Sequence, residues 1–201
     1  MIQLFSGTPG SGKSLHMAKM IYDYSSYRKD RLIIVNFEID TDKLRFPDRV
    51  VYVSNNDLTP EFLKKTAEEF YYTHPLKEGS ILLFIDECQI LFNARNWNEK
   101  GRLEWLSFFS QHRKYGFDIF LVAQFDMMID KQIRSLIEYE QIHRKVSNYG
   151  FLGTLVKLFA FGDLFICVEH WYTIKKKTSQ SFFKARKKYY SLYDTFKHFE
   201  N

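Results

Sequence analysis

Eight residues near the N-terminus constrain this chain more than any other feature. The segment "GTPGSGKS" follows the apolar run "IQLFS" and precedes a segment with helical spacing of apolar residues. It fits the pattern G-x-x-x-x-G-K-[ST], in which glycines let backbone N–H groups turn inward around phosphates at the positive end of a helix. Because strand, loop and helix occur in the required order, the segment predicts a phosphate-binding loop and not merely a flexible turn. The residues expected to bind nucleotide are Gly7, Thr8, Pro9, Gly10, Ser11, Gly12, Lys13 and Ser14.

Two residues of this loop and two acids further on predict the chemistry. Lys13 is expected to reach the β- and γ-phosphates, and the Ser14 hydroxyl to bind Mg²⁺. The run "SILLFIDE" ends in Asp86 and Glu87. Asp86 is expected to hold the Mg²⁺ through its water shell, and Glu87 to act as the general base for an attacking water. Helix capping is the alternative explanation for the acid pair, but the upstream loop favours catalysis, with ATP and Mg²⁺ as ligands.

A third element is "RKYGFDIFLVAQ", an apolar strand that ends in Gln124. The carboxyl edge of an open α/β sheet is where ligands bind, so Gln124 is expected to sense the γ-phosphate or to orient the water. The alternative is a polar residue that simply ends a buried strand. Arg113 precedes the strand and is a candidate arginine finger acting across a subunit boundary, with Arg134 a weaker candidate. Ordinary surface ion pairing explains either arginine equally well.

The order of apolar runs predicts the fold class. Strands are expected at 2–6, 31–37, 50–53, 80–85 and 117–123, and helices at 13–28, 59–72 and 101–115. Strands that alternate with helices indicate an α/β fold with a mainly parallel sheet between helices. From residue 139 onward, β-rich runs interrupted by glycines predict antiparallel strands. We therefore expect one domain over 1–201, with a nucleotide-binding core at 1–140 and a basic, aromatic-rich, β-rich appendage at 141–201.

The positive charge of the chain is concentrated in its last third. The net charge is +5, and residues 141–201 hold 11 Lys and Arg against 4 Asp and Glu. This distribution suits an anionic partner, either nucleic acid or a membrane surface, although a solvated basic face is the alternative.

Cysteine usage and the apolar stretches indicate the compartment. Cys88 and Cys167 give no zinc spacing and no disulfide framework, which favours a reducing compartment. The N-terminus lacks the basic and apolar regions of a signal peptide, so a cytoplasmic location is expected. The apolar stretch 151–168 is interrupted by Lys157, Gly162 and Asp163, whereas a membrane span needs about 20 apolar residues. No transmembrane helix is therefore expected in this chain.

Taken together, the motifs resemble the Zot (zonular occludens toxin) family, the assembly ATPases of filamentous phages. The segments that carry the resemblance are "GTPGSGKS", "FIDECQ", "HRKYGFDIFLVAQFDMMIDKQIR" and "YYSLYDTF", which sample almost the whole chain in the right order. The third segment is also similar to the glutamine-bearing strand of the FtsK–HerA DNA-pumping ATPases. The resemblance thus implies a P-loop NTPase fold of the RecA/FtsK–HerA type.

The resemblance also implies a function. It implies an ATP-hydrolysing domain that works as a homo-oligomeric ring on the cytoplasmic face of the inner membrane, with coat protein, single-stranded phage DNA and inner-membrane assembly proteins as partners. By the same analogy Gly7–Ser14 bind nucleotide, Asp86 supports Mg²⁺, Glu87 is the base and Gln124 the sensor. Family members usually carry a membrane-spanning helix after this domain. Without one before Asn201, the domain either has been separated from such a helix or relies on a partner or its basic tail for peripheral attachment.

Two other functions stay open at this stage. A P-loop kinase for a small molecule or nucleotide shares the loop but usually adds an arginine-rich lid that excludes water. The sequence shows no compact lid, and Glu87 favours water as the acceptor. A nucleotide-gated scaffold for DNA or membrane is the second, because "TIKKK" and "KARKKYY" combine basic groups with rings that can pair with phosphate and stack on bases.

Overall fold

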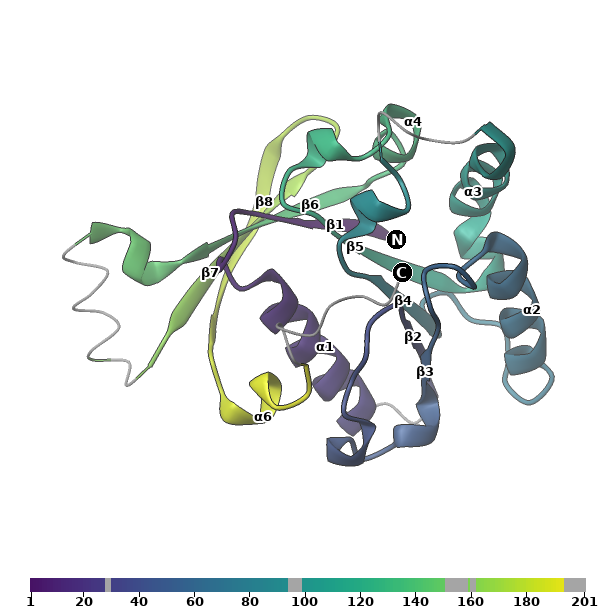
Figure 1. The fold of residues 1–201 in the computed structure, drawn as a ribbon, viewed down its shortest axis with the longest axis horizontal. Coiled ribbons are helices and arrows are strands. Elements are labelled where there is room, and N and C mark those ends of the chain that lie inside the picture. The colour runs from purple at the N-terminus through teal and green to yellow at the C-terminus, as the bar shows by residue number, and fades with distance from the viewer. Residues whose placement is uncertain (28–29, 94–98, 151–158, 160–161, 194–201) are drawn as a thin grey trace.

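A single open sheet organises the molecule (Figure 1). The computed structural model of the 201-residue chain describes residues 1–27, 30–93, 99–150, 159 and 162–193. Its eight strands lie in the order β3-β2-β4-β5-β1-β6-β7-β8, with parallel pairing from β3 through β6 and antiparallel pairing of β6, β7 and β8. The predicted α/β fold with a mainly parallel sheet is confirmed.

The elements follow the expected apolar runs closely. The strands are β1 Ile2–Ser6, β2 Leu32–Val35, β3 Val50–Tyr52, β4 Ile81–Ile85, β5 Phe117–Val122, β6 Tyr139–Lys145, β7 Leu164–Trp171 and β8 Lys176–Lys184. The α-helices are α1 Lys13–Tyr27, α2 Pro60–Tyr71, α3 Glu99–Gln111, α4 Lys131–Arg134 and α6 Lys187–Tyr190. Short 3₁₀ turns occupy Thr41–Lys43, Pro47–Arg49, Cys88–Ile90, His112–Tyr115, Asp126–Met128 and Val146–Asn148. Strands β2 and β4 are apolar throughout because both of their faces are covered.

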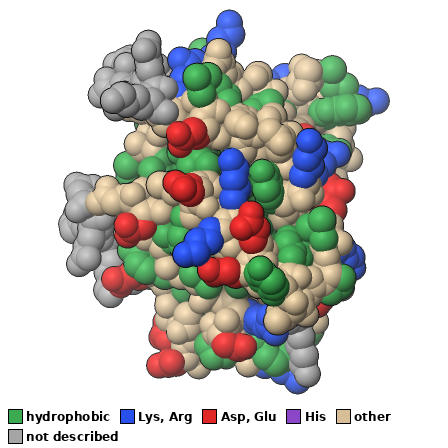
Figure 2. All heavy atoms as spheres, turned by 90° about the vertical axis from the view of Figure 1, so that its right-hand side faces the viewer, with side chains coloured by type: hydrophobic (Ala, Val, Ile, Leu, Met, Phe, Trp, Pro, Cys, Tyr) green, Lys and Arg blue, Asp and Glu red, His purple; other side chains and the backbone are tan. Residues whose placement is uncertain are grey.

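The two faces of the sheet carry separate cores. On one face, Met17 and Ile21 of α1 pack against Phe84 and Phe120. The opposite face is covered by α2 and α3, whose residues pack on the alternate side chains of the same strands: Leu63, Phe70, Phe108, Leu83 and Ile119. In Figure 1, α1 and α6 lie below the central strands, and α2 and α3 lie to the right of those strands, on the other side of the sheet. The outer face of that pair, seen in Figure 2, mixes basic and acidic side chains, as expected of solvated helices.

Capping residues fix the ends of two helices. Thr59 caps α2, since its Oγ1 accepts a hydrogen bond from the Phe62 N–H at 3.1 Å, and Pro60 occupies the first helical position. After α3 and its 3₁₀ extension, Gly116 turns the chain into β5 with a φ of 72°. A Cβ at Gly116 would collide with the Tyr71 hydroxyl, so this turn requires glycine for space as well as for conformation.

The C-terminal third continues the same sheet. Strand β6 pairs in parallel with β1, and the β7–β8 hairpin then extends the sheet outward, toward the left of Figure 1. The expected antiparallel strands are therefore present. The proposed boundary between core and appendage at residue 140 falls inside β6, and the division stays a proposal. No helix in the described part of the chain has the length and hydropathy needed to cross a bilayer, and residues 151–158, 160 and 161 of the apolar stretch lie outside the described residues.

Candidate nucleotide-binding site

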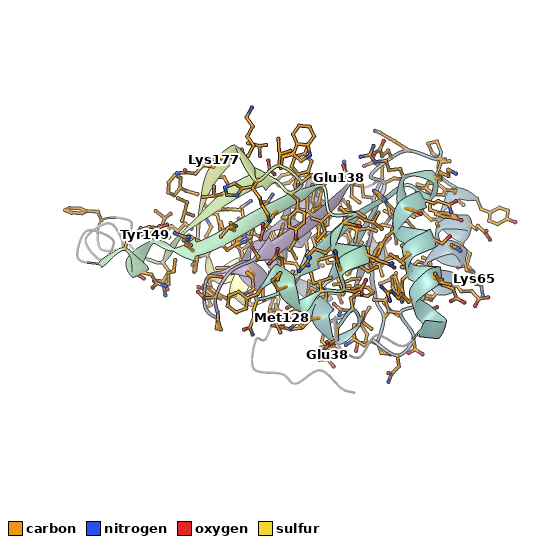
Figure 3. All side chains as sticks on the ribbon, turned by 90° about the horizontal axis from the view of Figure 1, so that it is seen from above. Glu38, Lys65, Met128, Glu138, Tyr149 and Lys177 are labelled. Atoms are coloured by element: carbon orange, nitrogen blue, oxygen red, sulfur yellow. The ribbon has the colours of Figure 1, made fainter. Side chains whose placement is uncertain are left out.

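The carboxyl ends of the parallel strands gather the predicted site residues at one edge of the sheet. The phosphate loop follows β1, Asp86 and Glu87 follow β4, and Gln124 follows β5. Figure 3 separates the two edges of the sheet: Glu38 after β2 and Met128 after β5 lie toward the lower side, which is the carboxyl edge, and Glu138 before β6 lies toward the upper side, which is the amino edge. Because β5 lies between β4 and β1, Gln124 comes between the loop and the two acids.

The loop adopts a backbone that requires its glycines. Gly7, Gly10 and Gly12 have φ values of 140°, 73° and 97°. A Cβ at Gly7 would lie 2.5 Å from the His143 carbonyl oxygen, and a Cβ at Gly12 would lie 2.4 Å from the Phe165 ring. The loop is therefore held tightly against β6 and β7, and its conformation excludes other residues at these two positions.

The Lys13 side chain is folded back onto the loop. Its Nζ donates hydrogen bonds to the carbonyl oxygens of Gly7 and Thr8 at 2.8 and 3.3 Å, and the residue is buried. Burial lowers the pKa of Lys13, while the negative charges of Glu87 and Asp86 oppose that shift. Among the described residues, none forms an ion pair with Lys13. Its ammonium is thus bound only by neutral carbonyls, which it can exchange for phosphate oxygens.

Ser14 and Asp86 meet where the sequence predicts the Mg²⁺ site. Ser14 Oγ donates to Asp86 Oδ2 at 3.2 Å, and the Asp86 side chain is buried. Asn36, at the end of β2, fixes the Asp86 backbone: its Oδ1 accepts from the Asp86 N–H at 2.7 Å, and its Nδ2 donates to the Asp86 carbonyl at 3.0 Å. Sequence reasoning missed Asn36, although a polar residue ending the run "RLIIVN" was a usable signal.

The surroundings of the Asp86 carboxyl group favour binding of a cation. Burial and, second, the charge of Glu87 raise its pKa to about 6, while hydrogen bonds from Tyr193 and Ser14 and from the Glu87 N–H act against that rise. Tyr193 Oη donates to Asp86 Oδ2 at 3.0 Å, and the Glu87 N–H donates to Oδ1 at 2.9 Å. In the described part of the chain no basic side chain pairs with Asp86. A divalent cation would supply the missing positive charge, so Ser14 and Asp86 fit a magnesium ion.

Glu87 occupies an unusual backbone conformation. Its φ and ψ of 46° and 45° place it in the left-handed region, which residues other than glycine seldom adopt. Such strained positions cluster at functional sites, where the surrounding structure fixes them. The turn brings the carboxylate beside Asp86, and Glu87 Oε2 accepts a hydrogen bond from Gln89 Nε2.

Gln124 is joined directly to the phosphate loop. Its carbonyl oxygen accepts a hydrogen bond from the Gly7 N–H at 3.2 Å. The residue is half-buried and lines a cleft of about 430 Å³, together with loop residues, Asp126, Glu140 and Arg144. The structure therefore brings Lys13, Ser14, Asp86, Glu87 and Gln124 to one edge, as predicted, and their catalytic roles stay predictions.

The two candidate arginines lie in different places. Arg113 lies at the opposite, amino edge of the sheet, where Nη2 pairs with Glu138 at 2.6 Å and Nε with Glu78 at 3.3 Å. Arg134 ends α4, and its Nη1 donates to the Asp126 carbonyl oxygen at 3.4 Å, beside the loop after Gln124. Among the described residues, neither arginine forms a hydrogen bond or ion pair with the phosphate loop, and the role of Arg113 as a finger on a neighbouring subunit stays a prediction.

A second cleft, of about 300 Å³, borders the later half of the phosphate loop. Loop residues form one wall, and Lys145, Phe165 and Tyr190 form the other. Aromatic rings and an ammonium group beside a phosphate loop suit a nucleoside with its sugar and base. The rings interleaved with basic residues in the last third of the sequence gave no sign that some of them would lie beside the phosphate loop.

The chain after α6 runs over the same site. Leu192 is buried in the α1-side core, and its carbonyl oxygen accepts from the Asp40 N–H at 2.9 Å. Tyr193 packs edge-on against Phe37, with ring centroids 5.0 Å apart, and directs its hydroxyl to Asp86. The motif "YYSLYDTF" thus begins as part of the nucleotide site, while its residues 194–196 lie outside the described residues.

Comparison with known proteins places this site in context. Residues 1–197 match the family model described as zonular occludens toxin (Zot). Among curated relatives, the Gene 1 protein of Enterobacteria phage fd is 33% identical over 123 residues, which are 57% of this chain and 35% of that protein. The Gene 1 protein of Salmonella phage IKe is 33% identical over 97 residues, 47% of this chain and 27% of that protein. The chain thus aligns with about a third of the length of these curated relatives.

Solved structures share the fold. The N-terminal domain of zonular occludens toxin from Neisseria meningitidis superposes with a TM-score of 0.54 and 23% identity, covering 96% of this chain and 98% of that one. The genome-packaging NTPase of Sulfolobus turreted icosahedral virus 2, solved with ATP-gammaS, gives a TM-score of 0.54 at 14% identity, over 91% of this chain and 96% of that one. At these identities the likeness concerns the fold, which is that of a P-loop NTPase.

Proposed function

The chain belongs to the zonular occludens toxin (Zot) family, and we propose that it is the ATP-hydrolysing motor domain of a filamentous-phage assembly machine. The observation that carries the proposal is the contact between Ser14 Oγ and Asp86 Oδ2, which lie 3.2 Å apart. Beside it, the Lys13 ammonium donates hydrogen bonds to the carbonyl oxygens of Gly7 and Thr8. These groups are the ones that a magnesium nucleotide needs on a phosphate loop.

In the proposed binding step, the triphosphate enters the loop from Gly7 to Ser14. Lys13 leaves the Gly7 and Thr8 carbonyls and binds the β- and γ-phosphates, which exchanges neutral acceptors for charged ones. Ser14 and the ionised Asp86 would hold Mg²⁺, which would supply positive charge to neutralise the charge that develops on the transferring phosphoryl group. The base and sugar occupy the cleft beside Phe165 and Tyr190.

In the proposed hydrolytic step, Glu87 accepts a proton from a water that Gln124 orients. The water oxygen forms a bond to the γ-phosphorus while the bond from that phosphorus to the β–γ bridging oxygen breaks, so that ADP and inorganic phosphate are the products. Lys13 and the backbone N–H groups of the loop stabilise the spreading negative charge. Glu87 is suited to the base role because the left-handed turn fixes its backbone next to Asp86.

We further propose the setting in which this domain works. A homo-oligomeric ring on the cytoplasmic side of the inner membrane would act on single-stranded phage DNA and coat protein together with inner-membrane assembly proteins. The family membership and the basic residues of 141–201 support this setting. The viral genome-packaging NTPase with the same fold supports a motor over a kinase.

The test is steady-state ATP turnover of the purified chain across protein concentrations, with and without single-stranded DNA. We expect Mg²⁺-dependent turnover whose specific activity rises with concentration, because an oligomer would complete each site with a neighbour's residue. Stimulation by single-stranded DNA would identify the cargo as nucleic acid. ATP binding without hydrolysis under every condition would contradict the motor and favour a kinase that lacks its acceptor or a nucleotide-gated scaffold.

A further inference from the structure

Three metal-ligating side chains from three elements converge next to the phosphate loop. His16 on α1, His143 on β6 and Cys167 on β7 place one ring nitrogen of each histidine and Cys167 Sγ within 4.8 Å of one another. His143 and Cys167 are almost fully buried and face each other as a direct cross-strand pair. The spacing of the two cysteines along the chain gave no sign of this cluster, because its members are far apart in sequence.

We propose that His16, His143 and Cys167 form a transition-metal site that takes Zn²⁺. Two imidazole nitrogens and one thiolate are ligand types that zinc prefers, and in a tetrahedral zinc site they lie roughly 3.5 Å apart. His16 Nδ1 and His143 Nε2 are 2.8 Å apart, so they need to separate by well under 1 Å to admit the ion. The site is distinct from the predicted Mg²⁺ site, which uses oxygen ligands.

The orientation of His143 is already fixed for ligation. Its Nδ1 lies 2.9 Å from the Gln141 carbonyl oxygen, which can only accept, so Nδ1 carries the proton. Burial lowers the pKa of His143 to about 4, which leaves Nε2 unprotonated at neutral pH. A ligating histidine typically donates its other N–H to a carbonyl or carboxylate in this way.

Gln141 offers an oxygen for the fourth position. Its Oε1 lies 3.1 Å from Cys167 Sγ, while its Nε2 donates to Glu169 Oε2 at 3.2 Å. Because the amide nitrogen is engaged on the far side, the oxygen faces the cluster. Gln141 Oε1 or a water would complete a tetrahedral N₂SO set, and the cleft lined by Gly7 and His143 provides an access path.

Binding has a defined proton balance. Burial, together with the charge of Glu169, raises the pKa of Cys167 to about 12, so the metal-free thiol is protonated at neutral pH. Zn²⁺ replaces that proton when the S–Zn bond forms, and the proton is released to solvent. His16, whose ring is stacked between Phe5 and Phe183, remains neutral and moves its proton from Nδ1 to Nε2. No oxidant or reductant is needed.

The site would connect the start of the helix after the phosphate loop to the C-terminal strands. His16 follows Ser14 by two residues on α1, whereas His143 and Cys167 belong to β6 and β7. A bound ion would therefore fasten the loop end of α1 to the edge from which the β7–β8 hairpin extends. Metal binding to the folded state alone would raise the thermal unfolding midpoint.

The experiment is a titration of the nucleotide-free 201-residue chain with Co²⁺, followed by displacement with Zn²⁺. We expect one Co²⁺ per chain, with thiolate-to-cobalt charge-transfer absorption and the visible bands of a tetrahedral site, both abolished by stoichiometric Zn²⁺. Cys88→Ser is the matched control, because Cys88 is the only other cysteine and is equally buried. Cys88→Ser should keep the full spectrum, and Cys167→Ser should lose the charge-transfer absorption.

The chain's two cysteines keep the test decisive even if Cys167→Ser does not fold. A thiolate band retained in Cys88→Ser can come only from Cys167. His16→Gln should then weaken Zn²⁺ binding at least about tenfold, because one ligand is replaced by a poorer one. Absence of thiolate absorption in the wild-type chain, or its loss in Cys88→Ser, would overturn the site. These readouts do not depend on ATP hydrolysis, so they stand apart from the proposed function.

Discussion

The two edges of the central sheet both gather charged residues, but they use them differently. At the amino edge the charges neutralise one another: Arg113 pairs with Glu138 at 2.6 Å, and the Met1 ammonium pairs with Asp118 at 2.9 Å. At the carboxyl edge Lys13 is held by carbonyl oxygens and Asp86 by neutral donors. Paired charges fasten a strand end, whereas buried charges without a counter-ion are ready for a ligand that supplies one.

The largest effect should follow from removing the Lys13 ammonium from the carboxyl edge of the sheet. Lys13→Ala should reduce ATP turnover about 1,000-fold and abolish measurable nucleotide binding, because the ammonium that lies on the phosphate loop itself is lost. Lys19→Ala is the matched control, since Lys19 lies on the same helix and pairs with Asp23 at 2.7 Å. Equal turnover in the two variants would mean that this edge does not bind the triphosphate.

A somewhat smaller effect should follow from removing the base alone. Glu87→Gln should keep ATP binding within a few-fold and lower the turnover number about 100-fold, since general-base catalysis contributes on that scale. Binding and single-turnover hydrolysis should be measured on the same preparation, with Glu68→Gln on α2 as the surface control. Normal hydrolysis in Glu87→Gln would remove Glu87 from the base role.

Substitutions at the amino edge of the sheet should lower the free energy of unfolding slightly. Arg113→Ala and Glu138→Gln break the same half-exposed ion pair, and each should cost roughly 1 kcal/mol or less of unfolding free energy in urea denaturation. Turnover of the assembled protein then separates the two variants. A loss of activity confined to Arg113→Ala would confirm the predicted arginine finger, while equal activity would assign Arg113 to the amino-edge pairing alone.

The smallest effect concerns how acid affects Asp86. Its pKa of about 6 in the folded chain lies above the ordinary value of 3.8, so the folded chain without metal binds a proton more tightly than the unfolded chain does. The free energy of unfolding should therefore rise as pH falls from about 6 toward 3.8. Mg²⁺ requires the ionised form, so kcat/KM should fall as pH drops through about 6. Tyr193→Phe removes a hydrogen bond that favours ionisation, so the midpoint should move upward and kcat/KM near pH 6 should fall roughly threefold.

In the Tyr193→Phe experiment, kcat/KM at alkaline pH is the internal control. There Asp86 is ionised in both proteins, and the two values should converge. A uniform loss at every pH would instead indicate that Tyr193 acts by packing on Phe37 and not through the carboxyl.

The sequence predicted those site residues that lie in short local motifs, but it did not predict those that only the fold brings together. The loop Gly7–Ser14 and the strand ends at Asp86 and Gln124 were readable because each motif lies on one short segment that follows an apolar run. Asn36 and Tyr193 were missed because their contacts with Asp86 join residues 50 and 107 positions apart. The same holds for His16, His143 and Cys167, which only the pairing of β6 with β7 and the packing of α1 bring together.

The central claim is that the carboxyl edge binds a magnesium nucleotide through Lys13, Ser14 and Asp86. The most direct measurement is a crystal structure of the chain with Mg²⁺ and a non-hydrolysable ATP analogue. The claim predicts that Lys13 Nζ leaves the Gly7 and Thr8 carbonyls for the β- and γ-phosphates, and that Mg²⁺ lies between Ser14 and Asp86. A nucleotide bound elsewhere, or bound with Lys13 still on the loop carbonyls, would contradict it.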